Sequence, residues 1–467
     1  MKKKFLTFCL CAYIAAVSPA AFADQTFELN SPPQKRALKL IQEGVSFLIS
    51  DKDAEAEQKF LQAKAADPYS AQAYNFLGLL YMKQELYQKA EAMLNQAVAI
   101  EPMYPEALRN LGKLYLNGDE FGKAANCLKK ALSQDRNQPF TWYLYGMALY
   151  FSGHLSEAVE AYETAFALEP ALPLEAVYNL AVAYHETGRF FEAVKQYERV
   201  VKGSPGHVNS LNNMGLIFSV MGEKERAIEA FKAVLAIDAS NVKARINLGN
   251  VFLSQKDLAE AEKIYRSAIS IDKTDISPRL NLGVVFYEKG DLESANQEWN
   301  AILQDNPDNI RVLSVMGSAY LEKHEYDKAI EVFDKMAEIM PENASVSNTL
   351  GYLLAEKGIE LEKAEKLIEK ALRLDKTNRA TYYDSLAWLY YRQGKFEKAL
   401  KIQKRALNTF RISHEKISSD VHYHLGKIHE KMDNFAEAQK AYELAIKSNT
   451  DETIVAKAKE SLAALPD

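Results

Sequence analysis

Cysteine, proline and glycine are all scarce in this sequence. Three cysteines occur among 467 residues, and Cys9 and Cys11 lie in an apolar segment near the N-terminus. If that segment is removed during export, Cys127 is the one thiol left and no internal disulfide can form. We expect Cys127 to pack between helices. The 14 prolines and 20 glycines, with 48% hydrophobic and 26% charged residues, exclude collagen-like and disordered classes.

Motifs of the common catalytic sites are missing as well. The chain contains no GxxxxGK(S/T) loop and no GxSxG elbow, and none of its His-Glu pairs continues to the second histidine of a zinc protease helix. His422, His424 and His429 gather near the C-terminus and raise the alternative of a metal site. His422 and His429, however, stand where other repeats carry aromatic residues, which favours packing. We therefore expect no enzymatic activity, no cofactor and no metal.

Only one long hydrophobic run is found, near the N-terminus. Phe5–Val17 follows three lysines and precedes the small residues Ala21 and Ala23, a pattern typical of a secretory signal peptide that is cleaved after Ala23. The run is shorter than the roughly 20 residues that a membrane-spanning helix needs. We interpret residues 1–23 as the signal peptide, residues 24–36 as an extended lead-in segment, and the mature protein as periplasmic without a membrane span.

An excess of positive charge is absent too. The full chain has a formal charge of −6, and loss of Lys2, Lys3 and Lys4 with the signal peptide leaves 54 basic and 63 acidic residues, a charge of −9. This balance argues against nucleic acid, or an anionic membrane surface, as the main partner.

What the sequence has in abundance is a repeat of 34 residues. In Ala71–Tyr104, two amphipathic stretches are followed by Pro102, which predicts two helices joined in a hairpin. Twelve such units follow one another, and a glycine or alanine marks the same position of each first helix, because small residues let paired helices approach closely. One position of the second helix is alanine throughout: Ala56, Ala90, Ala124, Ala158, Ala193, Ala227, Ala261, Ala295, Ala329, Ala364, Ala399 and Ala438.

This pattern resembles the tetratricopeptide repeat (TPR), over about nine-tenths of the chain. The resemblance implies an all-α, right-handed superhelical solenoid of about twelve TPR helical hairpins, here residues 37–452. Thr453–Leu465 has the pattern of one more helix, and we expect residues 453–467 to form a C-terminal cap on the last hairpin. With the signal peptide, the resemblance indicates a secreted bacterial member of the family.

Asparagine recurs at one position of the first helix, two residues before the glycine or alanine. We call this set the asparagine ladder: Asn110, Asn179, Asn213, Asn247 and Asn281. If the ladder faces the concave groove of the solenoid, its amides suit the backbone of an extended peptide, because each offers a donor and an acceptor. The same amides also suit bonds between neighbouring repeats, and both alternatives stay open.

Large apolar side chains stand at the neighbouring groove positions of units four to six. Such residues are candidate anchors for a partner: Phe140, Tyr143, Met147, Tyr150, Tyr178, Val182 and Leu216. Burial of some of them by the superhelix itself is the alternative. If these positions take no part in binding, Tyr383, Asp384 and Trp388 are the next candidates.

Two functional hypotheses follow. The first is a non-enzymatic scaffold of the bacterial cell envelope that binds a partner peptide or protein in the concave groove, within a secretion, pilus or polysaccharide-export assembly. The alternative is an accessory subunit of an envelope polysaccharide-synthesis enzyme, which contacts the polymer through Tyr143, Tyr150 and Tyr178.

Overall fold

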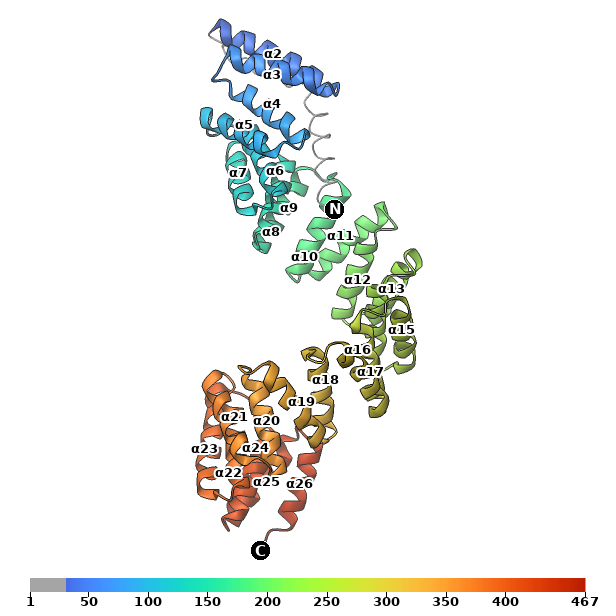
Figure 1. Cartoon of the computed structure of the whole chain (residues 1–467), viewed down its shortest axis with the longest axis vertical. Coiled ribbons are helices and arrows are strands. Elements are labelled where there is room, and N and C mark those ends of the chain that lie inside the picture. The colour runs from blue at the N-terminus through green and yellow to red at the C-terminus, as the bar shows by residue number, and fades with distance from the viewer. Residues whose placement is uncertain (1–30, 467) are drawn as a thin grey trace. The chain divides into compact units, whose positions relative to one another are not determined.

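The computed structural model describes residues 31–466, and this part of the chain forms 25 helices and no strand (Figure 1). The predicted signal peptide and residues 24–30 of the predicted lead-in lie outside the described residues. The lead-in prediction is wrong for its last residues, because helix α2 begins at Pro32. Pro32 and Pro33 occupy the first helical turn, where a missing backbone N–H leaves no hydrogen bond unmade.

The chain divides into two compact units, at residues 1–244 and 245–467. The first unit contains α2 (Pro32–Ile49), α3 (Asp53–Ala66), α4 (Ala71–Lys83), α5 (Tyr87–Ile100), α6 (Pro105–Asn117), α7 (Phe121–Gln134), α8 (Pro139–Phe151), α9 (Leu155–Leu168), α10 (Leu174–Glu186), α11 (Phe190–Gly203), α12 (Val208–Val220) and α13 (Lys224–Ile237). Helix α14 (Val242–Ser254) begins in the first unit and ends in the second.

The second unit continues in the same alternation. It contains α15 (Leu258–Ile271), α16 (Ile276–Glu288), α17 (Leu292–Asp305), α18 (Ile310–Glu322), α19 (Tyr326–Ile339), α20 (Ala344–Lys357), α21 (Leu361–Leu374), α22 (Arg379–Arg392), α23 (Phe396–Ser413), α24 (Ser419–Lys431), α25 (Phe435–Ser448) and α26 (Glu452–Ala463). From α2/α3 to α24/α25 the helices pair into twelve hairpins, which we number one to twelve, so the predicted repeat count is confirmed.

Each hairpin closes by the fit of one large side chain against one small residue. In hairpin four, a Cβ atom added to Gly146 would lie 2.7 Å from the ring of Tyr162, and in hairpin eight one added to Gly283 would lie 2.2 Å from the indole of Trp299. Both rings are fully buried. The glycine of the first helix has no side chain, and the aromatic ring of the second helix fills the space that this leaves.

Successive hairpins are joined by a repeated polar contact. The hydroxyl groups of Tyr81, Tyr115 and Tyr390 donate to a glutamate on the second helix of the preceding hairpin. The acceptors are Glu57, Glu91 and Glu365, at 2.8, 3.0 and 3.0 Å. Because donor and acceptor come from adjacent repeats, these bonds fix the stacking of one hairpin on the next.

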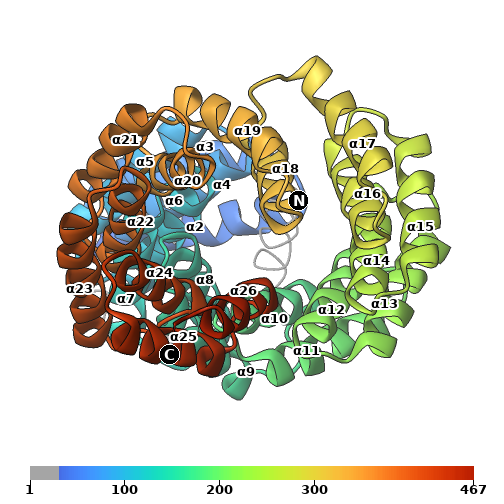
Figure 2. The same ribbon diagram turned by 90° about the horizontal axis from the view of Figure 1, so that it is seen from below.

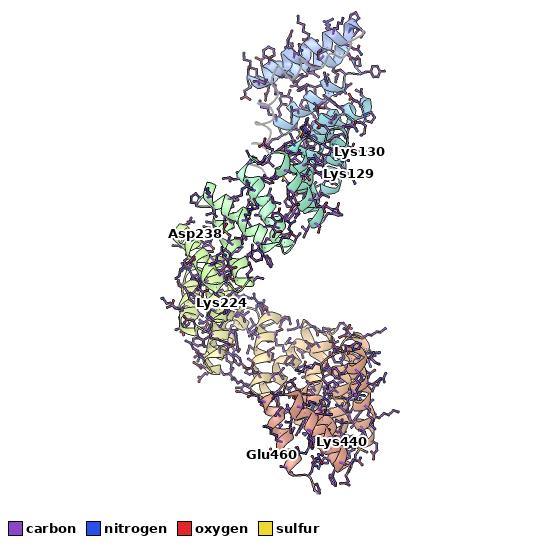
Figure 3. The ribbon with its side chains drawn as sticks, turned by 180° about the vertical axis from the view of Figure 1, so that it is seen from behind. Lys129, Lys130, Lys224, Asp238, Lys440 and Glu460 are labelled. Atoms are coloured by element: carbon purple, nitrogen blue, oxygen red, sulfur yellow. The ribbon has the colours of Figure 1, made fainter. Side chains whose placement is uncertain are left out.

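Within each unit the first helices of the hairpins lie on the inner side. Consecutive first helices contact one another, as α4, α6 and α8 do in the first unit and α20, α22 and α24 in the second, whereas consecutive second helices do not to the same extent. Figure 2 shows α20, α22 and α24 inside α21 and α23. The outer faces are charged: Lys129 and Lys130 are exposed on α7, and Lys440 on α25 pairs with Glu437 (Figure 3).

Helix α26 covers the end of the last hairpin. Ala458 packs against Ala438, Tyr442 and Ala445, and Leu462 lies beside them. A further helix at the predicted position therefore buries the apolar side that hairpin twelve would otherwise expose. Among the described residues, none of the helices is both long and apolar enough to span a membrane.

Candidate partner-binding site

The amides of the asparagine ladder bond to neighbouring repeats in the structure. In each case the side-chain Nδ2 donates to a group of the preceding hairpin: Asn110 to Asn75 Oδ1 (2.9 Å), Asn179 to Tyr143 Oη (2.7 Å), Asn213 to Tyr197 Oη (3.0 Å) and Asn281 to Asn250 Oδ1 (2.9 Å). Asn247 is half-buried on α14. The ladder therefore links the hairpins, which is the second of the two alternatives that the sequence leaves open.

Two predicted site residues are buried and need correction. Asn110 is 0% exposed and Tyr143 is 1% exposed. Asn110 lies beneath the surface between α4 and α6, while the Tyr143 ring packs against Tyr162, with 5.7 Å between ring centroids. Their positions on the inner helices were predicted correctly, but the repeats stack closely enough to cover them. Neither side chain reaches a partner on the surface.

The remaining apolar candidates are half-buried, and they differ in what they touch. Phe140 and Met147 pack at the margin of the core, and the Lys113 Nζ lies 5.3 Å from the centroid of the Phe140 ring. Tyr150, Tyr178, Val182 and Leu216 are also half-buried, on the inner helices α8, α10 and α12. These last four form what we call the inner apolar row, which keeps part of its apolar surface open to solvent.

Two tyrosines give the inner apolar row a polar side. Tyr178 lies edge-on to the imidazole of His207, with 4.9 Å between centroids, and Tyr150 Oη donates to Glu186 Oε1 at 2.6 Å. Burial raises the pKa of both hydroxyls, and Glu186 raises that of Tyr150 further. Both phenols therefore stay protonated at neutral pH, so each has an apolar ring and an O–H donor.

A buried polar cluster in the second unit is a feature that the sequence analysis did not assemble. His424 Nδ1 lies 3.0 Å from Asp384 Oδ2, and the two residues are 2% and 6% exposed. Gln403 Nε2 donates to Asp384 Oδ1 at 2.6 Å and to the Val421 carbonyl at 2.8 Å. The imidazole of His424 stacks on Trp388, with 4.2 Å between centroids. We call these residues the Asp384–His424 cluster.

The sequence does carry a signal for this cluster. His424 stands two residues before Gly426, which is the ladder position, and Asp384 stands three residues before Ala387. Asn110 and Asn75 have the same offsets in hairpins three and two. The His424–Asp384 contact therefore takes the place of the ladder bond between hairpins eleven and twelve, with two ionisable side chains instead of two amides. Gln403 is a second signal, because it occupies the position where Tyr162 and Trp299 fill the space over a glycine.

Charge balance in the cluster favours a protonated imidazole. Burial by itself lowers the pKa of His424, but the Asp384 carboxylate, by charge and by hydrogen bond, outweighs burial, and Asp420 and Glu356 add to it, so the pKa is raised. Burial raises the pKa of Asp420. Trp388 Nε1 donates to Glu356 Oε2 at 2.7 Å, which fixes this carboxylate at the edge of the indole that stacks on His424.

Cys127 and the C-terminal histidines His422 and His429 are buried or half-buried. Cys127 is half-buried against the core of the first unit, and burial raises the pKa of its thiol. No three His, Cys, Asp or Glu side chains within residues 31–466 are placed to hold a metal ion. His422 and His429 have lowered pKa values because of burial.

The fold and the site define an all-helical repeat protein whose inner face presents half-buried apolar groups. Family models described as tetratricopeptide repeat match residues 81–145 and 252–319, residues 143–208 and 212–276, residues 342–412, and residues 419–452. Taken together, these matches span more than half of the chain. The chain therefore belongs to the tetratricopeptide repeat family, and membership supports a role in protein–protein interaction.

Curated relatives match over a short segment. The chain is 31% identical to the photosystem I assembly protein Ycf3 of Synechococcus sp. (strain CC9902) over 87 residues, 18% of this chain and 50% of the relative. The chain is also 31% identical to Ycf3 of Prochlorococcus marinus (strain MIT 9211) over 93 residues, which are 20% of this chain and 54% of that relative. This chain thus spans about half the length of these relatives.

Two solved structures are similar to parts of the chain at low sequence identity. Yeast Tom70 is 16% identical with a TM-score of 0.43, covering 91% of this chain and 99% of Tom70. PilF of Pseudomonas aeruginosa is 17% identical with a TM-score of 0.39, covering 45% of this chain and 95% of PilF.

Proposed function

We propose that this protein is a non-enzymatic scaffold of the bacterial cell envelope that holds a protein partner on the inner face of hairpins four to six. The inner apolar row is the observation that carries the proposal. Tyr150, Tyr178, Val182 and Leu216 lie on the inner helices α8, α10 and α12 and are only half-buried. Aromatic and aliphatic groups of this kind concentrate binding energy when a partner removes them from water. Secretion, pilus or polysaccharide-export assemblies are the settings we propose.

The ladder contributes to binding indirectly in this proposal. The amides of Asn179 and Asn213 are engaged with Tyr143 and Tyr197 of the preceding repeats. They hold α10 and α12 in place and thereby position Tyr178. The alternative of an accessory subunit that contacts a polysaccharide through Tyr143, Tyr150 and Tyr178 is weakened, because Tyr143 is buried.

Replacing Tyr178 with alanine is expected to weaken partner binding at least thirtyfold. Truncation of a central aromatic anchor costs about 2 kcal/mol or more, and about 1.4 kcal/mol corresponds to a factor of ten. The measurement is a titration of the folded variant with the partner that co-purifies from envelope extracts and is identified by mass spectrometry.

Phe60→Ala is the matched control. Phe60 is 0% exposed in α3 of hairpin one, so its loss should lower the stability of the first unit without changing a contact in hairpins four to six. If a folded Tyr178→Ala variant binds the partner with wild-type affinity, the partner does not bind at hairpins four to six.

The envelope location is tested at the N-terminus of the mature protein. We expect the periplasmic fraction to contain a chain that begins at Asp24, because Phe5–Val17 is too short to remain as a spanning anchor. N-terminal sequencing after cell fractionation measures this directly. An intact Met1 end in the cytoplasmic fraction would contradict export and the envelope role with it.

A further inference from the structure

A cavity opens in the second unit between the second helices of hairpins eight and nine. Its volume is about 720 Å³. Helix α17 forms one wall and the start of α19 the other, with these polar residues in the lining: Glu293, Asn296, Gln297, Asn300, Gln304, Glu325 and Lys328. The cavity lies on the side away from the inner first helices, so it is separate from the inner apolar row.

The wall that α17 contributes is rich in carboxamides, and Glu293 is the one charged residue of α17 in the lining. At one, two, five and nine residues after Ala295, α17 has the carboxamides Asn296, Gln297, Asn300 and Gln304. In α21 the residues at the same offsets from Ala364 are all charged: Glu365, Lys366, Glu369 and Arg373. Gln297, Asn300 and Gln304 are exposed on α17. The other second helices have at most one carboxamide at these four offsets, so the row of four in α17 is specific to this helix.

The junction beside the cavity departs from the regular stacking of hairpins. Helix α18 packs less extensively against α17 than α16 does against α15 or α20 against α19. The ladder position of α18 holds Val315, so hairpin nine has no ladder amide there to donate to hairpin eight. The tyrosine contact between these two hairpins is also changed, since Tyr320 Oη donates to Asn296 Oδ1 at 2.7 Å in place of a glutamate.

The amide spacing matches an extended polypeptide. Asn296, Asn300 and Gln304 follow one another every four residues of α17, which places them about 6 Å apart along the helix axis. Two residues of an extended chain span about 6.8 Å. Each carboxamide offers a donor and an acceptor, which is what a peptide group needs. No aromatic ring is among the residues that line the cavity, so a sugar ring would find no stacking surface.

We propose that this cavity binds an extended polypeptide segment through its backbone. The carboxamides of Asn296, Asn300 and Gln304 pair with alternate peptide groups of the segment. Asn296 does so through its Nδ2 group, since its Oδ1 accepts from Tyr320. Lys328, which pairs with Glu325 and lies 5.6 Å from the Tyr320 ring centroid, closes the cavity on the α19 side. This second site is independent of the inner apolar row.

The test selects peptides from a random 12-residue phage-display library on the purified full chain. Enriched clones are synthesised with a fluorescent label, and binding is measured by fluorescence anisotropy. The double variant Asn300→Leu/Gln304→Leu should raise the Kd at least tenfold. Asn126→Leu, at an exposed carboxamide on α7, is the matched control and should leave the Kd unchanged. Alternate N-methylation of the peptide backbone should abolish binding.

Each contrary outcome identifies a different error. Enrichment of no clone, or equal binding to wild type and the double variant, overturns the proposal. Clones that lose affinity with Tyr178→Ala but not with the double variant occupy the inner apolar row, so this site fails while the proposed function stands. Labelled cellohexaose that binds wild type but not the double variant, with no peptide binding there, makes the cavity a glycan site. Circular dichroism establishes that every variant is folded.

Discussion

Replacing Asp384 with alanine is expected to lower the free energy of unfolding of the second unit by about 3–5 kcal/mol, the range for removing one partner of a buried ion pair. The change leaves His424 and Gln403 buried without the carboxylate that both of them contact. Urea unfolding followed by circular dichroism measures the loss. Asn75→Ala is the matched control, because Asn75 accepts the equivalent ladder bond from Asn110 as a neutral amide. Its cost should be about 1–3 kcal/mol.

The same pair makes the stability of the second unit depend on pH. The pKa of His424 is raised in the folded state above its unfolded value of about 6.5. Its contribution is therefore fully present below about pH 6.5 and is lost as pH rises through the folded pKa. Asp384→Asn should remove this dependence, so the stability difference between wild type and variant should shrink above about pH 6.5.

Two other groups near the cluster have shifted pKa values. Burial lowers the pKa of His422 and raises that of Asp420, so His422 titrates below about pH 6.5 and destabilises the fold on acidification. Asp420 titrates above its unfolded value of about 3.9. A stability difference between wild type and Asp384→Asn that stays constant from pH 6 to pH 9 would contradict a charged Asp384–His424 pair.

Truncation of Trp299 to alanine is expected to cost about 3–5 kcal/mol, the range for a large aromatic residue in a core. Trp299 is 0% exposed, and its Nε1 donates to the Leu280 carbonyl at 3.1 Å. Since the facing residue is Gly283, the first helix has no side chain to move into the space. The variant therefore keeps both a cavity and a buried carbonyl without its donor. Urea unfolding followed by circular dichroism again provides the measurement.

Trp142→Ala is the control for this prediction. Trp142 is half-buried on α8, and its Nε1 donates to the Arg136 carbonyl in an exposed bond of 2.8 Å. Solvent replaces that bond when the side chain is removed. A loss for Trp142→Ala as large as that for Trp299→Ala would show that aromatic area alone, and not the fit against glycine, sets the stability of a hairpin.

The fold followed from the sequence because its two determinants are local. The recurring alanines and glycines mark the positions at which paired helices contact each other. Because these positions recur every 34 residues, the same hairpin is predicted along the whole chain. The start of α2 was misplaced because Pro32 and Pro33 fall inside the predicted lead-in, although prolines are well suited to a first helical turn.

The site was predictable only in part. Which residues occur on the inner helices follows from their offset to Gly146 or Gly215, and this placed Tyr150, Tyr178 and Leu216 correctly on the inner helices. How deeply each is covered depends on the stacking of adjacent repeats, which helical period does not encode. Tyr143 shows this, because Asn179 of the next hairpin reaches its hydroxyl and the repeat covers its ring.

The ladder bonds have a consequence for the order of the repeats. Hairpins two and three are joined by a bond between two neutral amides, Asn110 and Asn75. A duplicated copy of such a hairpin would again place an amide beside an amide, so the ladder bond could still form. Hairpins eleven and twelve are different. His424 bonds to the Asp384 carboxylate, which Gln403 also contacts, and beside an amide neighbour it would lack the carboxylate that stabilises its charge. The last two repeats are therefore not interchangeable with the others, and shuffled arrays should tolerate insertion before hairpin eleven but not between eleven and twelve.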